Sequence, residues 1–153
     1  MERYRLLKNE ATADIAFIAY GKTLNELFRN IAIAVSNVMV LNVKRRGTKK
    51  ISFKLNSENI DYLVIDFINK IIFYKDYKNI LITDAKIKVD KNLNLKCQAV
   101  GEKLDKLKDL FLVDVKAATL HDLNVKKKKE RQWLIISGDM LGMPKCLYMT
   151  TQG

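Results

Sequence analysis

The segment Glu10-Ala11-Thr12-Ala13-Asp14-Ile15-Ala16-Phe17 joins a short polar approach to an apolar strand and leaves one carboxylate, Asp14, at the junction. The apolar pattern continues to Tyr20 with apolar side chains on both faces, which predicts a central strand of a sheet. Short acidic residues at a strand entrance commonly accept hydrogen bonds from nearby backbone N–H groups. Taken alone, Asp14 is therefore a turn former, and a functional role requires a partner elsewhere in the chain.

Composition predicts one soluble globular domain. The chain has 153 residues, 48% hydrophobic and 29% charged, with only six Gly and one Pro. This length supports a sizeable core but not two separate domains. The charged N-terminus leads into no apolar signal region, and the longest apolar stretch, 31–41, is too short to span a membrane. We therefore expect a cytoplasmic protein without membrane association.

The cysteines and the histidine exclude two common kinds of site. Cys97 and Cys146 have no C-x-x-C partner, and His121 is the only histidine. This pattern indicates neither a zinc site nor a disulfide framework. We expect Cys97 to pack in the core.

The formal net charge of +11 indicates a polyanionic partner, because Lys and Arg gain by displacing counterions from phosphate backbones. A lysine-rich composition with charges solvated over the whole surface is the alternative. The run Lys126–Lys129 carries no interleaved aromatic residues and is interpreted as a solvated hairpin tip.

Two segments have helical periodicity. Thr23 and Glu26 form a capping-box pattern before a helix that ends near Met39. Asn56 and Ser57 are the expected caps of a second helix, which ends near Tyr74 or Lys75. The remaining periodic segments predict strands over 3–6, 14–20, 50–55, 80–89, 93–100, 113–125 and 133–136. Together they predict an α+β fold: a two-layer domain with two amphipathic helices packed on one face of a mixed, mostly antiparallel sheet.

Polar residues within the later strands are the other candidates for a site. The alternative to a functional role for Lys116 is a lysine whose charged end reaches solvent from a half-buried strand. The alternative for His121 is a histidine with a purely structural role. Asp139 follows the last apolar strand, where a turn is again the simpler interpretation. If the fold brings Asp14 and Asp139 together, paired carboxylates with backbone carbonyls suit a hard cation such as Ca²⁺ or Mg²⁺.

Five sequence stretches together resemble the archease family over about residues 3 to 140. They are 11–17, 20–28, 37–40, Gly101-Glu102 and 115–123, in the order and spacing of that family. The resemblance implies a small α+β protein that is not an enzyme. It implies an activator of the GTP-dependent ligase that joins tRNA exons, which speeds guanylylation of the ligase and allows multiple turnovers.

The resemblance also implies site residues. Asp14 and Asp139 correspond to the pair that holds a divalent cation, to which Met140 would add its backbone carbonyl, and Lys116 corresponds to a lysine important for activation. Ca²⁺ is the expected ion, with Mg²⁺ and Mn²⁺ as alternatives. The ligase is the expected partner, and contact with tRNA is indirect. Supporting roles fall on His121 and Glu102.

The chain departs from the family pattern at three places. Ala11 replaces the histidine of the motif before Asp14, and Ser137-Gly138 stands where aliphatic residues are expected. Residues 141–153 extend beyond an expected domain of residues 1–140. This extension is expected either to cover the site or to be a disordered tail.

Two other classes of function compete with a ligase activator. A basic RNA-binding or chaperone module acting directly on tRNA would account for the net charge and the lysine runs. A metal-dependent hydrolase is the weakest alternative, because two carboxylates without an assigned base make an incomplete site.

Overall fold

The computed structural model describes residues 3–8, 14–40, 47–110, 113–118, 124–128 and 132–144. Helices and strands in these ranges follow one another along the chain as β1 (Tyr4–Lys8), β2 (Asp14–Gly21), α1 (Leu24–Met39), β3 (Lys49–Asn56), α2 (Ile60–Lys78), β4 (Ile80–Val89), β5 (Asn94–Lys103), the 3-10 helix η1 (Leu104–Leu110), β6 (Val113–Ala118), β7 (Asn124–Lys128) and β8 (Gln132–Pro144).

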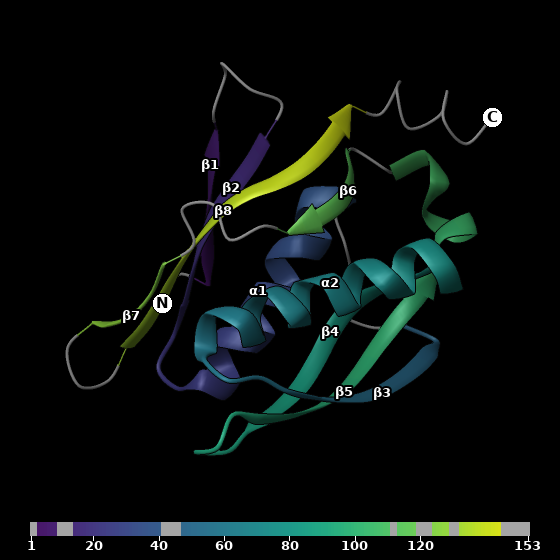
Figure 1. The fold of residues 1–153 in the computed structure, drawn as a ribbon. Coiled ribbons are helices and arrows are strands. Elements are labelled where there is room, and N and C mark those ends of the chain that lie inside the picture. Colours follow the sequence, from purple (N-terminus) through teal and green to yellow (C-terminus); the bar gives the residue numbers. More distant parts are fainter. Residues whose placement is uncertain are drawn as a thin grey trace.

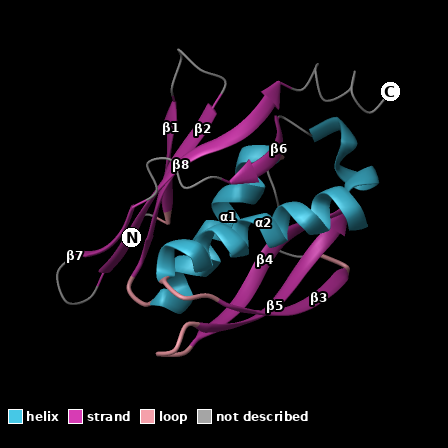
Figure 2. Ribbon diagram, viewed as in Figure 1, coloured by secondary structure: helices cyan, strands magenta, loops and turns pink. Residues whose placement is uncertain are grey.

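The described strands form two antiparallel sheets. One has the order β1-β2-β8-β6, with β7 also paired to β8, and the other has the order β3-β5-β4. Helices α1 and α2 lie between the two sheets (Figure 1), and Figure 2 shows the strands in magenta on either side of the cyan helices. The predicted α+β class, with two helices packed on antiparallel strands, is confirmed. The division of the strands between two sheets is a feature that their alternation did not reveal.

Helix α1 is the centre of the molecule. Thr23 caps it as predicted, because its Oγ1 accepts the backbone N–H of Glu26 at 3.1 Å. Most residues from Leu27 to Met39 are buried, since the helix packs against β2 as well as β4. A helix surrounded by protein is expected to be apolar on nearly all sides.

Two buried polar residues of α1 bond to the strands on either side. Asn30 Nδ2 donates to the carbonyl of Tyr20 at 2.7 Å, at the end of β2. Ser36 Oγ bonds to the carbonyl of Ala32 at 3.0 Å and to that of Ile82 in β4. These bonds satisfy polar groups that would be costly to bury alone, and they orient the helix between the sheets.

Helix α2 begins and ends later than the sequence pattern predicted. Its cap is Asn59, whose side chain accepts the N–H of Tyr62 at 2.9 Å, because Asn56 remains in β3 and bonds to Asn94 at 2.7 Å. The helix continues to Lys78 and ends at Asn79, which adopts a left-handed conformation that asparagine tolerates.

The strands predicted over residues 113–125 and 133–136 are present in part, but their bounds were wrong. The chain forms β6 and β7 instead, and residues 119–123 lie outside the described residues. Both strands pair with β8, which spans Gln132–Pro144 and is much longer than predicted. Gly138 and Asp139 resemble a turn in sequence, but they lie within the strand as part of an irregularity opposite Ala16. Residue 140, the expected end of the domain, lies within β8, residues 145–153 are not described, and the expected division of the chain stays a prediction.

Cys97 packs in the core as predicted. It lies on the helix-facing side of β5 with 2% of its surface exposed, and burial raises the pKa of its thiol from 9.0 to about 12. The same strand face contributes Leu95 and Ala99 to the core.

The raised pKa of Cys97 predicts alkaline destabilisation. Between pH 9 and about 12 the unfolded thiol ionises while the folded thiol stays protonated, so stability present below pH 9 is lost as the pH rises. From pH 8 to pH 10 the free energy of unfolding is expected to fall by about 1 kcal/mol more in the wild type than in Cys97→Ala. Urea unfolding of both proteins at the two pH values measures this difference. Equal pH dependence in the two proteins would contradict it.

Candidate functional site

The strand register brings the candidate site residues of β2, β6 and β8 close together along the backbone. Strand β8 lies between β2 and β6, and Leu141 pairs with Asp14 on one side and with Ala117 on the other. Met140, in the next row, pairs with Ile15 and Ala118. Asp139 precedes Met140, and Lys116 precedes Ala117, so both adjoin these rows. Residues far apart in sequence thus meet at one end of the larger sheet.

The candidates Asp139 and Lys116 both coincide with irregularities in strand pairing. In β8, Gly138 and Asp139 stand opposite the single residue Ala16. In β6, Lys116 is the extra residue between Val115 and Ala117, whose partners in β8 are adjacent. Bulges of this kind are over-represented beside functional sites, because they interrupt pairing and redirect the strand.

Of the remaining candidates, the structure describes only Glu102, which lies away from these rows. Glu102 is in β5 of the smaller sheet, where it accepts the backbone N–H of Thr48 at 2.7 Å and forms an ion pair with Lys106 at 3.9 Å. These contacts connect β5 to the start of β3 and to η1, and no strand pairing joins Glu102 to the β2-β8-β6 rows. His121 and Ala11 lie outside the described residues.

The donor set on the larger sheet fits a hard cation in its chemistry. Two carboxylates and a backbone carbonyl are oxygen ligands of the type that Ca²⁺ and Mg²⁺ prefer. Within the described ranges, no three or more His, Cys, Asp or Glu side chains gather around one point.

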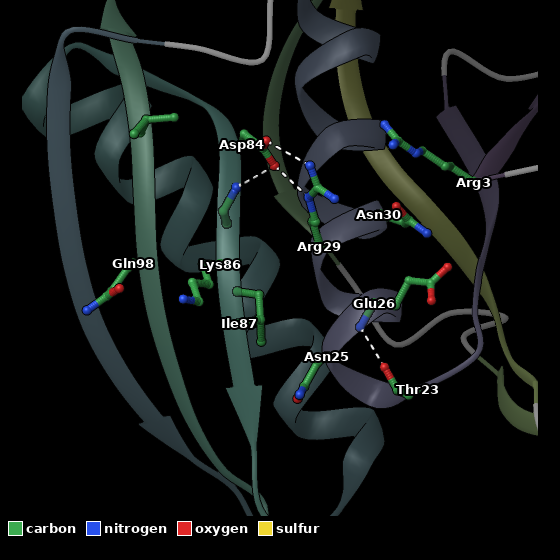
Figure 3. Close-up of a pocket in the computed structure, with 12 residues that line it drawn as sticks. Arg3, Thr23, Asn25, Glu26, Arg29, Asn30, Asp84, Lys86, Ile87 and Gln98 are labelled. Carbon is green, nitrogen blue, oxygen red and sulfur yellow. Dashed lines mark hydrogen bonds and ion pairs between the residues drawn. The ribbon is translucent and has the colours of Figure 1, made fainter.

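A pocket of about 610 Å³ lies between α1, β4 and the start of β1 (Figure 3). None of the candidate site residues lines it. Most of its lining is polar or charged: Arg3, Thr23, Asn25, Glu26, Arg29, Asn30, Asp84, Ala85, Lys86, Ile87, Gln98 and Val100. No spacing in the sequence connects the residues of α1 with those of β4, so this pocket could not be predicted from the sequence.

One wall of the pocket is an ion pair between α1 and β4. Arg29 Nε and Nη2 donate to the two carboxylate oxygens of Asp84 at 2.9 and 3.0 Å. The hydrogen bond to Asp84 is the main reason that the pKa of Arg29 is raised above its usual value. Asp84 also accepts the backbone N–H of Ala85 at 2.8 Å. Its carboxylate is therefore hydrogen-bonded and charge-paired within the protein.

Arg3 forms another part of the lining. Its Nη1 is buried and has no hydrogen-bond partner in the described part of the chain. A buried donor without an acceptor costs free energy, so an incoming acceptor at this point would be favourable.

Neither helix in the described residues has the length and hydropathy needed to cross a bilayer.

Comparisons with known proteins agree on one family. The model of the Archease protein family matches residues 4–137. Protein archease of Pyrococcus abyssi is 33% identical over 129 residues, which make up 82% of this chain and 90% of that protein. Protein archease of Sulfurisphaera tokodaii is 35% identical over 120 residues, which cover 78% of this chain and 86% of that protein. The solution structure of Methanobacterium thermoautotrophicum protein 1598 has a TM-score of 0.71 at 25% identity, covering 90% of this chain and 97% of that one.

Proposed function

The chain belongs to the archease family, and from that membership we propose that it activates a tRNA-splicing RNA ligase through a divalent-metal site on the larger sheet. The ligase performs the chemistry, and this protein acts as its non-catalytic cofactor. The observation that carries the proposal is the register of β2, β8 and β6, in which Asp14, Asp139 and Lys116 belong to adjoining rows.

In this proposal Asp14 and Asp139 hold the cation, with Met140 contributing its backbone carbonyl. The ion is Ca²⁺ by preference, because an irregular strand end with mixed carboxylate, carbonyl and water ligands suits its flexible coordination. Mg²⁺ demands stricter octahedral geometry and is the alternative, together with Mn²⁺. When bound, the ion supplies positive charge beside the phosphates of the ligase reaction.

Lys116 has a separate role. Its ammonium group supplies a positive charge for phosphate oxygens of the nucleotide or for a carboxylate of the ligase. Negative charge develops on the phosphates during nucleotidyl transfer, and a cation at this point stabilises it. The bulge in β6 supports this assignment, because the extra residue interrupts regular pairing at that position.

The proposal is tested by guanylylation of the cognate ligase with labelled GTP. Adding this protein is expected to raise the rate of guanylylation and the number of turnovers. Removing divalent ions with a chelator should abolish the stimulation, and Ca²⁺ should restore it. Failure to stimulate with Ca²⁺, Mg²⁺ or Mn²⁺ present would overturn the proposal.

A further inference from the structure

The smaller sheet carries a row of three lysines on the side turned away from the helices. Strand pairing sets Lys54 opposite Lys96 and Lys88 opposite Lys96, so one lysine from each strand of β3-β5-β4 stands in a single row. All three side chains are exposed. Directly opposed side chains in antiparallel strands have Cβ atoms about 4.5 to 5.5 Å apart.

The neighbouring rows add positive charge. The next row consists of Ser52, Gln98 and Lys86, all exposed, and Lys50 follows in the row beyond it. Together, Lys50, Lys54, Lys86, Lys88 and Lys96 form what we term the lysine face.

Three acidic residues on or beside the lysine face bond to other groups of the protein and compensate only part of its charge. Two acidic residues lie in the outward rows: Asp84 is held by Arg29, and Glu102 accepts the N–H of Thr48 and pairs with Lys106. Asp90, in the turn after β4, accepts the N–H groups of Asn92 and Asn94 at 2.8 and 3.0 Å. These hydrogen bonds, led by that of Asn94, and the nearby charge of Lys96 lower the pKa of Asp90. Asp90 therefore stays ionised, is held in the turn and compensates part of the charge of Lys96.

Protection of sheet edges does not account for the whole arrangement. Lysines on edge strands commonly prevent edge-to-edge aggregation, and this explains Lys54 and Lys88, since β3 and β4 are the edges. Lys96 lies on the central strand β5, where it has no edge to protect. Like charges directly opposite one another destabilise a sheet. A row that is unfavourable for folding therefore indicates a polyanionic partner.

We propose that the lysine face binds the phosphate backbone of double-helical RNA. Protein interfaces are depleted in lysine and enriched in aromatic residues and arginine, whereas phosphate contacts favour lysine. The face has no aromatic residue among its outward rows, so it offers no platform on which unpaired bases could stack. Ser52 and Gln98, which share a row with Lys86, are of the kind that bond phosphates and 2′-hydroxyls without reading sequence.

The adjoining pocket extends this surface. Lys86 and Gln98 belong both to the outward rows and to the pocket lining (Figure 3), so the face and the pocket are continuous. The buried donor of Arg3 in that lining supplies a place for a phosphate oxygen.

The test compares two triple variants that lose the same charge. Lys54→Gln/Lys88→Gln/Lys96→Gln removes the central row. Lys78→Gln/Lys103→Gln/Lys106→Gln removes three exposed lysines from the end of α2, the end of β5 and η1. Binding of a short fluorescein-labelled RNA duplex is followed by fluorescence anisotropy from about 50 to about 200 mM KCl.

The wild type is expected to bind the duplex with a steep salt dependence and to bind its separated strands more weakly. The row variant should lose about tenfold or more in affinity and have a salt slope flatter by about 2 to 3, because three phosphate contacts are removed. The control variant should lose less than about threefold, since only the net charge changes. The row variant should unfold at or above the wild-type temperature, because a repulsive row has been relieved.

Several results would overturn the proposal. They are an equal loss of affinity in the two variants, equal affinity for duplex and single strands, or equal affinity for poly-glutamate. Binding of double-helical RNA by the lysine face does not depend on the ligase. Guanylylation measured without RNA reports the proposed activator function alone, so failure of one proposal is distinguishable from failure of the other.

Discussion

Asp14→Ala is expected to lose both cation binding and ligase activation. Replacing a carboxylate ligand removes a negative charge and a coordinating group together. Affinity for Ca²⁺ should therefore fall by at least about 10- to 100-fold, which is the loss typical even for residues that only hydrogen-bond to a metal ligand. Stimulation of ligase guanylylation should fall by at least about tenfold at limiting Ca²⁺. Isothermal titration calorimetry measures the first quantity and labelled GTP transfer the second.

Lys116→Ala separates the two proposed roles. It should bind Ca²⁺ as tightly as the wild type, yet stimulate guanylylation at least about tenfold less, because its charge acts on the ligase reaction and not on the ion. Glu58→Ala removes an exposed carboxylate before α2 and serves as the matched control, with neither property changed. Wild-type stimulation by Asp14→Ala would remove the metal-site assignment, and wild-type stimulation by Lys116→Ala would remove the role of the lysine.

Phe67→Ala is expected to be the most destabilising single truncation in the core. Phe67 is fully buried on α2, with its ring centroid 5.2 Å from that of Phe28 in an edge-to-face arrangement and 6.1 Å from that of Phe53. It therefore connects both helices and the smaller sheet. Truncation should lower the free energy of unfolding by about 3 to 5 kcal/mol through lost burial and the cavity that remains. Urea unfolding followed by circular dichroism measures the change.

The matched control lies on the same helix. Phe73 is 37% exposed and contacts the rings of Tyr74 and Tyr77, so Phe73→Ala loses much less buried surface. Its cost should stay below about 1 kcal/mol. Similar costs for the two truncations would show that Phe67 does not connect the elements energetically as its contacts indicate.

Local sequence patterns predicted helices and strands well where interactions between neighbouring residues alone decided the structure. The cap at Thr23 and the strand Ile80–Val89 follow from neighbouring residues, and both were confirmed. The ends of helices and strands were predicted poorly where contacts with residues distant in sequence competed with local signals. Asn56 has the chemistry of a helix cap, but its bond to Asn94 keeps it in β3.

The candidate site was identified from sequence only through family resemblance. Asp14 and Asp139 each look like turn residues, and no spacing relates them. Their proximity along the backbone depends on β8 lying between β2 and β6, and on the irregularities that interrupt its pairing. The metal and activation roles stay predictions until the two variants are measured.

The sequence by itself determined the class of the fold, the two helices and the apolar strand that begins at Asp14, because hydrophobic periodicity and capping act between near neighbours. Only the tertiary structure decided that the strands divide into two sheets around a buried α1, that Asp14 lies across from Leu141, and that Lys54, Lys96 and Lys88 share one row. Strand order and register are set by long-range packing, and a shift of one residue would move every side chain of a strand to the other face. A lysine row exists only once that register is chosen.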